Sequence, residues 1–313
     1  MEGAYYNGQY LNRLERLGYS QAEIDNKLES TFEEMFYGPE GVRLCHCAGP
    51  DMMYIEDTGN HDVRTEGMSY AMMFCVQMNR QKEFDCLWRW VVTHMYLTEG
   101  ENAGYFAWSC HTDGSKNSDG PAPDGEEFFA MSLFFAANRW GSGEGVLDYA
   151  SWARRILHAC VHKGEEAGSG FPMWNPENHL IKFIPNCEFT DPSYHLPHFY
   201  ELFALWSDEC DRPFWHAAAA ASRQYLRKAC HARTGLSAEY AEYDGRPHRG
   251  DQPDRHDWFF SDAYRTLGNI ALDAQWFGDK DGWAQETAAH IQQFFEEKEH
   301  GQTNGIYLID GTP

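Results

Sequence analysis

PAPDGEEFFAMSLFFAANRW, residues 121–140, contains the most readily predicted helix of this chain. Two prolines stiffen a short loop, and Asp124 follows at the start of an apolar segment. Glu127 comes three residues later, and this spacing predicts a capping box that begins a helix over about 125–141. We therefore take this apolar helix as the element that organises the fold.

The same arrangement, an acidic residue at the start of an apolar helix, occurs twice more. Glu66 follows Thr65, which we expect to cap the helix, in TEGMSYAMM (65–73), and Asp262 lies near the start of SDAYRTLGNIALDAQWF (261–277). Helix N-termini stabilise ionised carboxylates, and like-charged neighbours raise the pKa of one of them. Two carboxyls with different roles are what glycoside hydrolysis requires. Each acid alone is better explained as a helix cap, but three of them, together with aromatic-rich loops, favour a site.

The rest of the chain predicts an all-α protein. Further helical patterns cover about 20–37, 65–78, 82–97, 147–162, 194–209, 213–232 and 281–300, with a Ser20–Glu23 capping box at the first. Apolar and amphipathic helices alternate, and long loops recur before the apolar ones. This pattern predicts helix hairpins in a ring, with the helix starts on one rim. Strand signals are short, at 179–184 and 305–309.

Composition excludes several classes of partner. The 25 basic and 48 acidic residues give a net charge of −23, which disfavours nucleic acid and anionic membrane surfaces. No apolar signal region or membrane span is evident, and most of the nine cysteines lie in apolar helical stretches. We therefore expect a soluble cytoplasmic protein with reduced thiols. Aromatic residues make up 15% of the chain, and their rings suit sugar faces.

Two sequence features raise the possibility of a metal site. CHC at 45–47 has adjacent residues that cannot easily surround one ion, and no partner CxxC is present. His158 and His162 are one helical turn apart, but the sequence shows no third ligand. We therefore expect no metal and no other cofactor.

Three segments together resemble a known family. TEGMSYAMM (65–73), PAPDGEEFFAMSLFFAANRW (121–140) and FFSDAYRTLGNIALD (259–273) resemble, in order and spacing, the signature segments of glycoside hydrolase family 8. The resemblance implies one catalytic domain, residues 1–313, with an (α/α)6 barrel fold. That barrel has twelve helices and about nine are predicted, so we expect the last C-terminal helices to be lacking.

Within this family, the loop 105–108 and DPSYHLPHFYELF (191–203) are most similar to the reducing-end xylose-releasing exo-oligoxylanases. This resemblance implies inverting hydrolysis of β-1,4-linked xylo-oligosaccharides by a protein we expect to be a monomer. Glu66 would be the general acid and Asp262 the general base, while Asp124 would hold and distort the sugar and Tyr194 would help to hold the water. The expected substrate-binding residues are Trp108, Tyr105 and Arg265.

Arg265 could pair with an acid and keep it ionised, or form a purely structural ion pair. Inversion needs room for a water, so we predict carboxyl groups of Glu66 and Asp262 about 6.5–9.5 Å apart. Asp254 and Asp257 are rival bases, ranked lower because they lie in the polar loop before the helix.

Three other functions stay open. The chain could be an endo-acting xylanase or β-1,4-glucanase of the same family, since no cleft-blocking loop is visible in the sequence. It could be a non-catalytic sugar-binding barrel protein, although the presence of Glu66 and Asp262 argues against the loss of catalytic activity. It could be an epimerase with histidine bases, for which His195 and His198 are the candidates, but packing or substrate hydrogen bonding explains both better.

Overall fold

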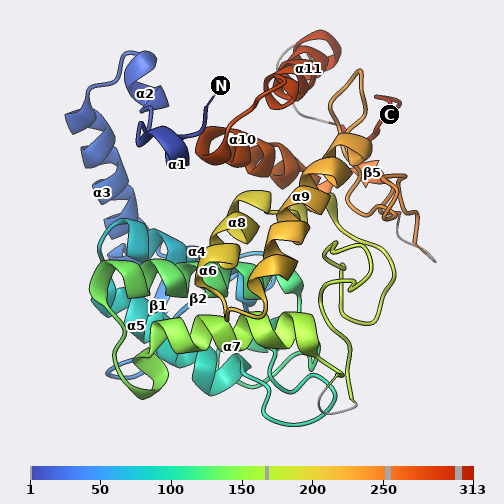
Figure 1. The fold of residues 1–313 in the computed structure, drawn as a ribbon. Helices are drawn as coiled ribbons and strands as arrows, with labels where there is room; N and C mark the ends of the chain where they lie inside the picture. The colour runs from blue at the N-terminus through green and yellow to red at the C-terminus, as the bar shows by residue number, and fades with distance from the viewer. Residues whose placement is uncertain (1, 166–168, 251–254, 300–304) are drawn as a thin grey trace. The chain divides into compact units, whose positions relative to one another are not determined.

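A computed structural model describes residues 2–165, 169–250, 255–299 and 305–313, and it is mainly helical (Figure 1). The chain divides into two compact units. We call Tyr10–Ala159 the N-terminal unit, and Met1–Gln9 with Cys160–Pro313 the C-terminal unit. The division falls inside one helix, α7 (Tyr149–His162).

Helices dominate the N-terminal unit, where α4 packs against α5 and α6. Besides most of α7, its helices are α2 (Arg13–Arg16), α3 (Gln21–Tyr37), α4 (Thr65–Gln77), α5 (Gln81–Trp90), the π-helical turn η1 (Val91–Met95), α6 (Pro123–Trp140) and the 3-10 turn η2 (Gly145–Leu147). Two antiparallel ribbons, missed by the sequence analysis, join β1 (Cys45–Cys47) to β2 (Met53–Ile55), and β3 (Asp62–Arg64) to β4 (Ser109–His111).

The predicted caps are correct at one helix and wrong at two. Ser20 and Glu23 form the predicted capping box at α3. At α6 the N-cap is Ala122, with no side-chain cap, so the capping box predicted for Asp124 and Glu127 is wrong. Pro123 explains the difference, because its fixed φ and missing N–H suit the first helical position. The N-cap of α4 is likewise the residue before Thr65.

An aromatic cluster forms part of the core of the N-terminal unit. The Trp88 ring lies 5.9 Å from Phe106, 5.8 Å from Phe129 and 5.4 Å from Trp152, between ring centres. These residues come from α5, the loop after η1, α6 and α7, and Trp88, Phe106 and Phe129 are fully buried. The cluster therefore fixes the loop that contains residues 105–108 onto α5 and α6.

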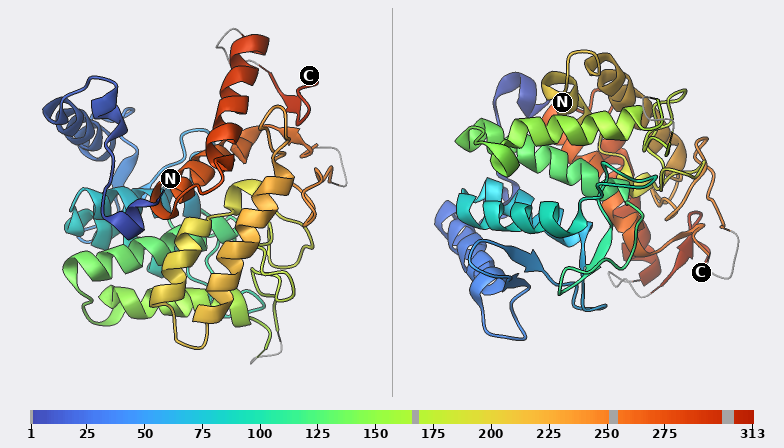
Figure 2. Two further views of the ribbon diagram at one scale, coloured as in Figure 1. Left: turned by 45° about the horizontal axis from the view of Figure 1, so that its top comes forward. Right: turned by 90° about the horizontal axis from the view of Figure 1, so that it is seen from below.

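The C-terminal unit is also built from helices, with α8 packed along α9, and α10 against α8 and α11 (Figure 2). Its elements are α1 (Ala4–Asn7), η3 (Pro192–Tyr194), α8 (Pro197–Trp206), α9 (Arg212–Ala229), η4 (Ser261–Tyr264), α10 (Arg265–Phe277), α11 (Trp283–Glu299), and the paired strands β5 (Trp258–Phe259) and β6 (Tyr307–Leu308). The helix predicted from residue 261 is therefore a 3-10 turn followed by α10. The segment 305–309 contains β6, and Ile181 forms a single bridge to Trp174.

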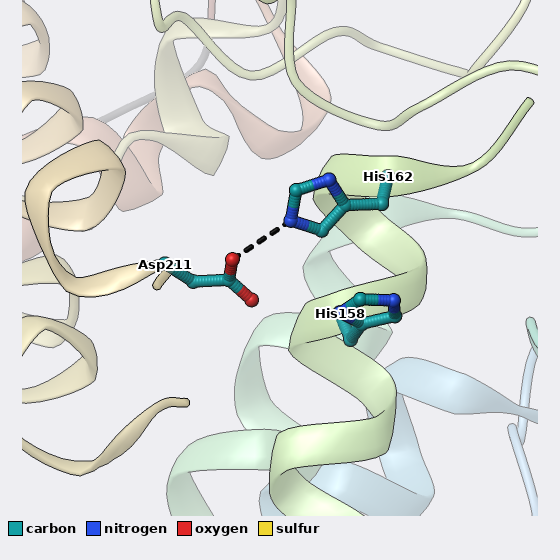
Figure 3. A group of neighbouring side chains, drawn as sticks. All are labelled: His158, His162 and Asp211. Atoms are coloured by element: carbon teal, nitrogen blue, oxygen red, sulfur yellow. Dashed lines mark hydrogen bonds and ion pairs between the residues drawn. The ribbon is translucent and has the colours of Figure 1, made fainter. Parts of the chain in front are cut away.

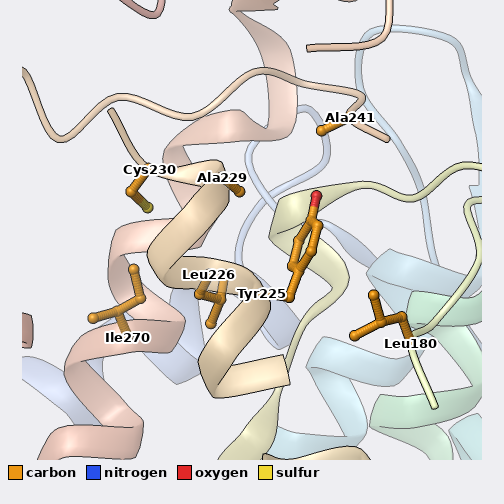
Figure 4. Close-up of a cluster of buried hydrophobic side chains, with 7 residues drawn as sticks. All are labelled: Leu180, Tyr225, Leu226, Ala229, Cys230, Ala241 and Ile270. Carbon is orange, nitrogen blue, oxygen red and sulfur yellow. The ribbon is translucent and has the colours of Figure 1, made fainter. Parts of the chain in front are cut away.

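A buried cluster ties two long loops of the C-terminal unit to α9 (Figure 4). Its members come from α9, α10 and the loops before η3 and β5, and they are Leu180, Tyr225, Leu226, Ala229, Cys230, Ala241 and Ile270. Because the loops are packed rather than solvated, they can hold side chains at defined places.

We expected free thiols at the cysteines and no membrane span among the helices. All nine cysteines lie in described parts of the chain, and each is a free thiol. Among the described helices, none combines the length and the apolar character needed to cross a membrane.

Candidate active site

Glu66 and Asp124 occupy equivalent positions on two helices in contact. Each is the second residue of its helix, α4 or α6. Gly125 lets the two first turns meet, because a Cβ there would lie 2.5 Å from the Cβ of Thr65. Asp124 is 4% exposed, and its Oδ1 accepts a hydrogen bond from the Gly125 N–H at 3.0 Å. The structure thus places two predicted site residues on adjacent helix starts of one unit.

Trp108 lies beside the same helix start. The β3–β4 ribbon pairs Arg64 with Ser109, and the Thr65 N–H donates to the Trp108 carbonyl at 2.9 Å. The Arg64 guanidinium lies 5.3 Å from the centre of the Trp108 ring, within cation–π range. Trp108 is 36% exposed, whereas most tryptophans of the core are buried. A partly exposed, backbone-anchored indole is suited to stacking against a sugar.

Tyr105, in contrast, is completely buried. Its hydroxyl donates to the carbonyl of Ala159 at 3.1 Å. The next residue, Phe106, donates its N–H to Oε1 of Glu126 at 3.0 Å. Burial of Glu126 raises the pKa of its carboxyl to about 8. Sequence reasoning missed Glu126, because nothing in DGEE distinguishes a buried acid from a solvated one.

Asp262 and Arg265 form an ion pair in the C-terminal unit. Arg265 Nη2 lies 2.9 Å from Oδ2 of Asp262, and the guanidinium is 5.8 Å from the ring centre of Tyr194. The Asp262 side chain is 41% exposed, whereas that of Arg265 is 12% exposed. A neighbouring guanidinium favours the ionised carboxylate, which is the form that a general base requires. The predicted pairing of Arg265 with an acid is therefore present.

Asp191 belongs to the same neighbourhood and was missed by sequence reasoning. It is 1% exposed, caps η3, and accepts a hydrogen bond from the Ser193 N–H at 2.6 Å. Burial raises the pKa of Asp191 to about 7, although the Arg265 charge lowers it. Asn269 of α10 donates to the Ser193 carbonyl at 2.7 Å, which ties the turn carrying Tyr194 to the helix after Asp262. An aspartate directly before Pro and Ser was the available signal.

The structure also bears on the other candidate bases, two aspartates before η4 and two histidines near α8. Asp257 makes a bidentate pair with Arg255, at 2.7 and 2.9 Å, and this pair lowers the pKa of Asp257. Asp254 lies outside the described residues. Burial lowers the pKa of both His195 and His198 to about 3, so both rings are neutral. A proton acceptor that is fully buried and so weakly basic is a poor epimerase base.

His162, one of the two histidines considered for a metal, is held by carboxylates. Its Nε2 lies 2.7 Å from Asp211 Oδ1 (Figure 3). Its Nδ1 lies 2.8 Å from Glu165 Oε2. Burial lowers the pKa of His162, but hydrogen bonds to both carboxylates outweigh it and the pKa is raised. The raised pKa favours protonation, and protonation removes the lone pair that a metal would need. His158 lies one turn earlier on the same helix.

In the CHC segment, Cys45 and Cys47 lie on β1, and Cys45 is buried. Burial raises the pKa of the Cys45 thiol to about 12. A metal ligand must be the thiolate, so this thiol is poorly suited to the role.

Glycoside hydrolysis requires two carboxyl groups with different roles, and each unit of this chain carries partly exposed or paired acids near a helix start. The model of the glycosyl hydrolases family 8 matches residues 19–309. The chain belongs to this family, and its fold class is the (α/α)6 barrel. The resemblance found in the three sequence segments is thereby confirmed.

Sequence relatives and solved structures match this chain over all or nearly all of its length. A reducing end xylose-releasing exo-oligoxylanase of Halalkalibacterium halodurans is 54% identical over 100% of this chain and 79% of its own length. The structure of Rex8A from Paenibacillus barcinonensis complexed with xylose is 54% identical, with a TM-score of 0.96 over 100% of this chain and 82% of that one. A more distant relative, Endoglucanase 2 of Ruminiclostridium josui, is 26% identical over 95% of this chain and 60% of its own length.

Proposed function

We propose that this protein is an inverting glycoside hydrolase that acts on β-1,4-linked xylo-oligosaccharides and releases xylose from the reducing end. One observation carries the proposal. Identity is 54% over the whole chain with an exo-oligoxylanase but 26%, over 95% of the chain, with Endoglucanase 2 of Ruminiclostridium josui. A difference of this size favours the exo-oligoxylanase activity over the endo-acting alternative.

In the proposed mechanism, Glu66 protonates the leaving glycosidic oxygen while Asp262 removes a proton from the attacking water. The Arg265 ion pair at 2.9 Å supports the second role, because it favours an unprotonated Asp262 at neutral pH. Glu66 and Asp262 belong to different units, so the predicted separation of their carboxyls stays a prediction.

The remaining site residues hold substrate and water. Asp124, beside Glu66 on the adjacent helix start, would bind hydroxyl groups of the sugar, and the partly exposed Trp108 would stack on its face. Tyr194, beneath the Arg265 guanidinium, would orient the water for Asp262. The complete burial of Tyr105 argues against direct sugar contact, and we assign it to support of the loop.

Product analysis with xylotriose tests the activity. The purified protein should release xylose from xylotriose and leave the reduced alditol intact, and NMR should show inversion at the newly formed anomeric carbon. Glu66→Gln and Asp262→Asn should each lower kcat by about 10³-fold or more, because each removes a proton transfer. Retention of configuration would contradict the assigned roles.

Polymeric xylan separates the exo activity from its endo-acting rival. Rapid cleavage of xylan into a range of products would establish an endo-xylanase, and rapid cleavage of a β-1,4-glucan would establish a glucanase. If the protein turns over no β-1,4-xylo-oligosaccharide while Glu66→Gln binds xylobiose as well as the parent, the chain is a sugar-binding barrel protein.

The proposal also covers the domain organisation, the oligomeric state and the cellular location of the protein. Residues 1–313 would act as one catalytic domain and as a monomer, since a small neutral oligosaccharide requires no second subunit. We place it in the cytoplasm, because nine unbridged cysteines suit a reducing compartment. Sedimentation equilibrium checks the monomer, and a dimeric mass would contradict it.

A further inference from the structure

The Trp108 backbone is fixed on both sides, whereas its indole has few fixed partners. The Trp108 N–H donates to the Gly120 carbonyl at 2.9 Å, and its carbonyl accepts from the Thr65 N–H at 2.9 Å. Within the described ranges, no aromatic ring stacks on the indole and its N–H donates to no residue. The Arg64 guanidinium, 5.3 Å from the ring centre, is therefore the contact that distinguishes one face of the indole from the other.

A buried carboxylate holds Arg64 in this place. Arg64 Nε donates to Oδ1 of Asp62 at 3.0 Å, and Asp62 is 7% exposed. The two residues are two positions apart on β3, so their side chains leave the same face of the strand. A free arginine side chain samples many rotamers, and a charge-assisted hydrogen bond to a buried carboxylate selects among them. Asp62 thus sets where the Arg64 guanidinium lies.

The second oxygen of Asp62 is fixed from the opposite strand. Ser109 Oγ donates to Oδ2 of Asp62 at 2.9 Å, and Asn117 Nδ2 donates to Ser109 Oγ at 3.0 Å. Ser109 is 1% exposed and pairs with Arg64 in the register of the ribbon. It is also the residue directly after Trp108. The contacts from the indole through Arg64 and Asp62 therefore return to the strand that follows Trp108.

This arrangement limits how a sugar can use the indole. A sugar stacks on the face of a ring, and a guanidinium held over one face occupies one of the two. The opposite face is then the one that a sugar can use. Arg64 is also the N-cap residue of α4, the helix that carries Glu66. The contact therefore ties the orientation of the Trp108 ring to the start of that helix.

We propose that Asp62 is a positioning residue that holds the Arg64 guanidinium over one face of Trp108 and thereby reserves the other face for the sugar. This inference rests on the proposed function, in which Trp108 stacks on the substrate. Without the Asp62 carboxylate, Arg64 leaves the indole and the ring takes up more than one orientation. Substrate binding then weakens, while the proton transfers are retained.

Steady-state kinetics on xylotriose tests the inference through Trp108 itself. We expect Asp62→Ala and Arg64→Met each to raise KM about three- to fivefold with kcat within about twofold of the parent, because stacking acts in both ground and transition states. In the Trp108→Ala background, neither change should raise KM further by more than about 1.5-fold, since residues that act through one ring are not additive. The Arg64 side chain is 26% exposed, so Arg64→Met tests the pair without emptying a buried position.

Asp113, in the turn after β4, is the matched control. Its Oδ1 accepts hydrogen bonds from the Ser115 N–H at 2.9 Å and from the Ser115 hydroxyl at 2.6 Å, and its side chain is exposed. It is thus an aspartate that binds a serine next to the same ribbon, as Asp62 does within it. Asp113→Ala should leave KM and kcat unchanged. An equal rise in KM in Asp113→Ala and Asp62→Ala would contradict a specific role for Asp62.

Two other kinetic results would overturn the inference. One is a KM increase from Asp62→Ala that is as large in the Trp108→Ala background as in the parent, which would show that Asp62 does not act through the indole. The other is an increase from Arg64→Met that persists without the indole, which would show that Arg64 contacts the substrate itself.

Fluorine NMR of protein labelled with 5-fluorotryptophan provides a readout that does not depend on activity. The Trp108 resonance is identified by its loss in Trp108→Phe. Arg64→Met and Asp62→Ala should each shift or split this resonance, whereas Asp113→Ala should leave it in place. If neither of the first two variants moves the resonance, the inference fails. If instead the parent does not cleave xylotriose, the proposed function fails, while the resonance still reports whether Asp62 holds Arg64 over the ring.

Discussion

Gly125 lies so close to Thr65 that a Cβ on Gly125 would come within 2.5 Å of the Thr65 Cβ and 2.6 Å of its Oγ1. Real Cβ atoms do not approach other heavy atoms to this distance, so one of the two helices would have to move. The contact sets how close the starts of α4 and α6 can come, and with them Glu66 and Asp124.

Gly125→Ala should therefore destabilise the protein and lower its activity. Overpacking costs about 1–3 kcal/mol, which outweighs the ~1 kcal/mol that alanine gains over glycine in a helix. We also expect kcat to fall about tenfold or more, because Glu66 shifts relative to Asp124. Chemical denaturation and xylotriose kinetics measure the two effects.

Gly268 on α10 is the control for this substitution. A Cβ at Gly268 would meet nothing within 4 Å. Gly268→Ala should therefore raise the free energy of unfolding by about 0.5–1 kcal/mol. If both alanine variants change stability in the same direction, close packing of Gly125 against Thr65 is not the reason for the glycine.

Glu126 should make stability fall as pH rises. Burial raises its pKa from 4.5 to about 8, so the folded chain keeps a proton that the unfolded chain loses near pH 4.5. The contribution of Glu126 to stability is fully present below about pH 4.5, and it is lost as pH rises through about 8. Glu126→Gln lacks this titration and should gain stability relative to the parent between pH 5 and 9, by up to a few kcal/mol.

The comparison must be made as a difference between parent and variant at each pH. Asp191 also titrates in this range, with its pKa raised to about 7, and its effect cancels in that difference. A difference that is constant from pH 5 to 9 would show that the Glu126 carboxyl is not protonated in the folded protein.

Trp108→Ala should weaken substrate binding. Loss of the stacking surface removes an interaction made in both ground and transition states, so KM should rise about tenfold, equivalent to ~1.4 kcal/mol. Trp283 is a matched control, because it also lies under an arginine, with the Arg227 guanidinium 4.7 Å from its ring centre. Trp283→Ala should leave KM unchanged, and an equal rise in both variants would argue against a specific role for Trp108.

Arg223 should be important for stability rather than activity. It pairs with Asp273, Nη2 to Oδ1 at 2.7 Å, and with Glu201. Arg223→Met leaves two poorly solvated carboxylates without their cation. We expect a loss of about 2 kcal/mol, below the ~3–5 kcal/mol of a fully buried pair because the Arg223 side chain is 32% exposed.

Arg246 offers the comparison for Arg223. It pairs with Asp244 at the same 2.7 Å, but its side chain is 78% exposed. Arg246→Met should leave the free energy of unfolding almost unchanged, because water screens an exposed pair. Thermal or denaturant unfolding of both variants gives the answer, and similar losses would show that burial does not set the strength of these pairs.

Sequence reasoning succeeded where local chemistry decides the structure. The Ser20–Glu23 capping box and the apolar segments predicted the longer helices to within a few residues, and Glu66 lies in the first turn of its helix as expected, while the catalytic roles of Glu66 and Asp262 stay predictions. Asp124 was misread as a cap because Pro123 takes the first helical position by its own geometry.

The remainder depends on tertiary contacts. Ribbons of three-residue strands carry too little pattern to be found in a sequence, and the burial of Asp191, Glu126 and Glu239 arises from segments distant along the chain. Ser261 has a φ of +46°. The sequence does not predict this conformation, since glycine or asparagine is the residue expected at a positive φ.

The β3–β4 ribbon limits the insertions and deletions that the segment around Trp108 can accept. Because successive side chains of a strand face opposite sides, a one-residue slip of β4 against β3 would turn Trp108 away from the start of α4. Insertions or deletions that shift this register must therefore be even in number to leave the indole beside Arg64. In a library that varies loop length by single residues next to the ribbon, the members with an odd-numbered register shift would present Trp108 on the wrong face.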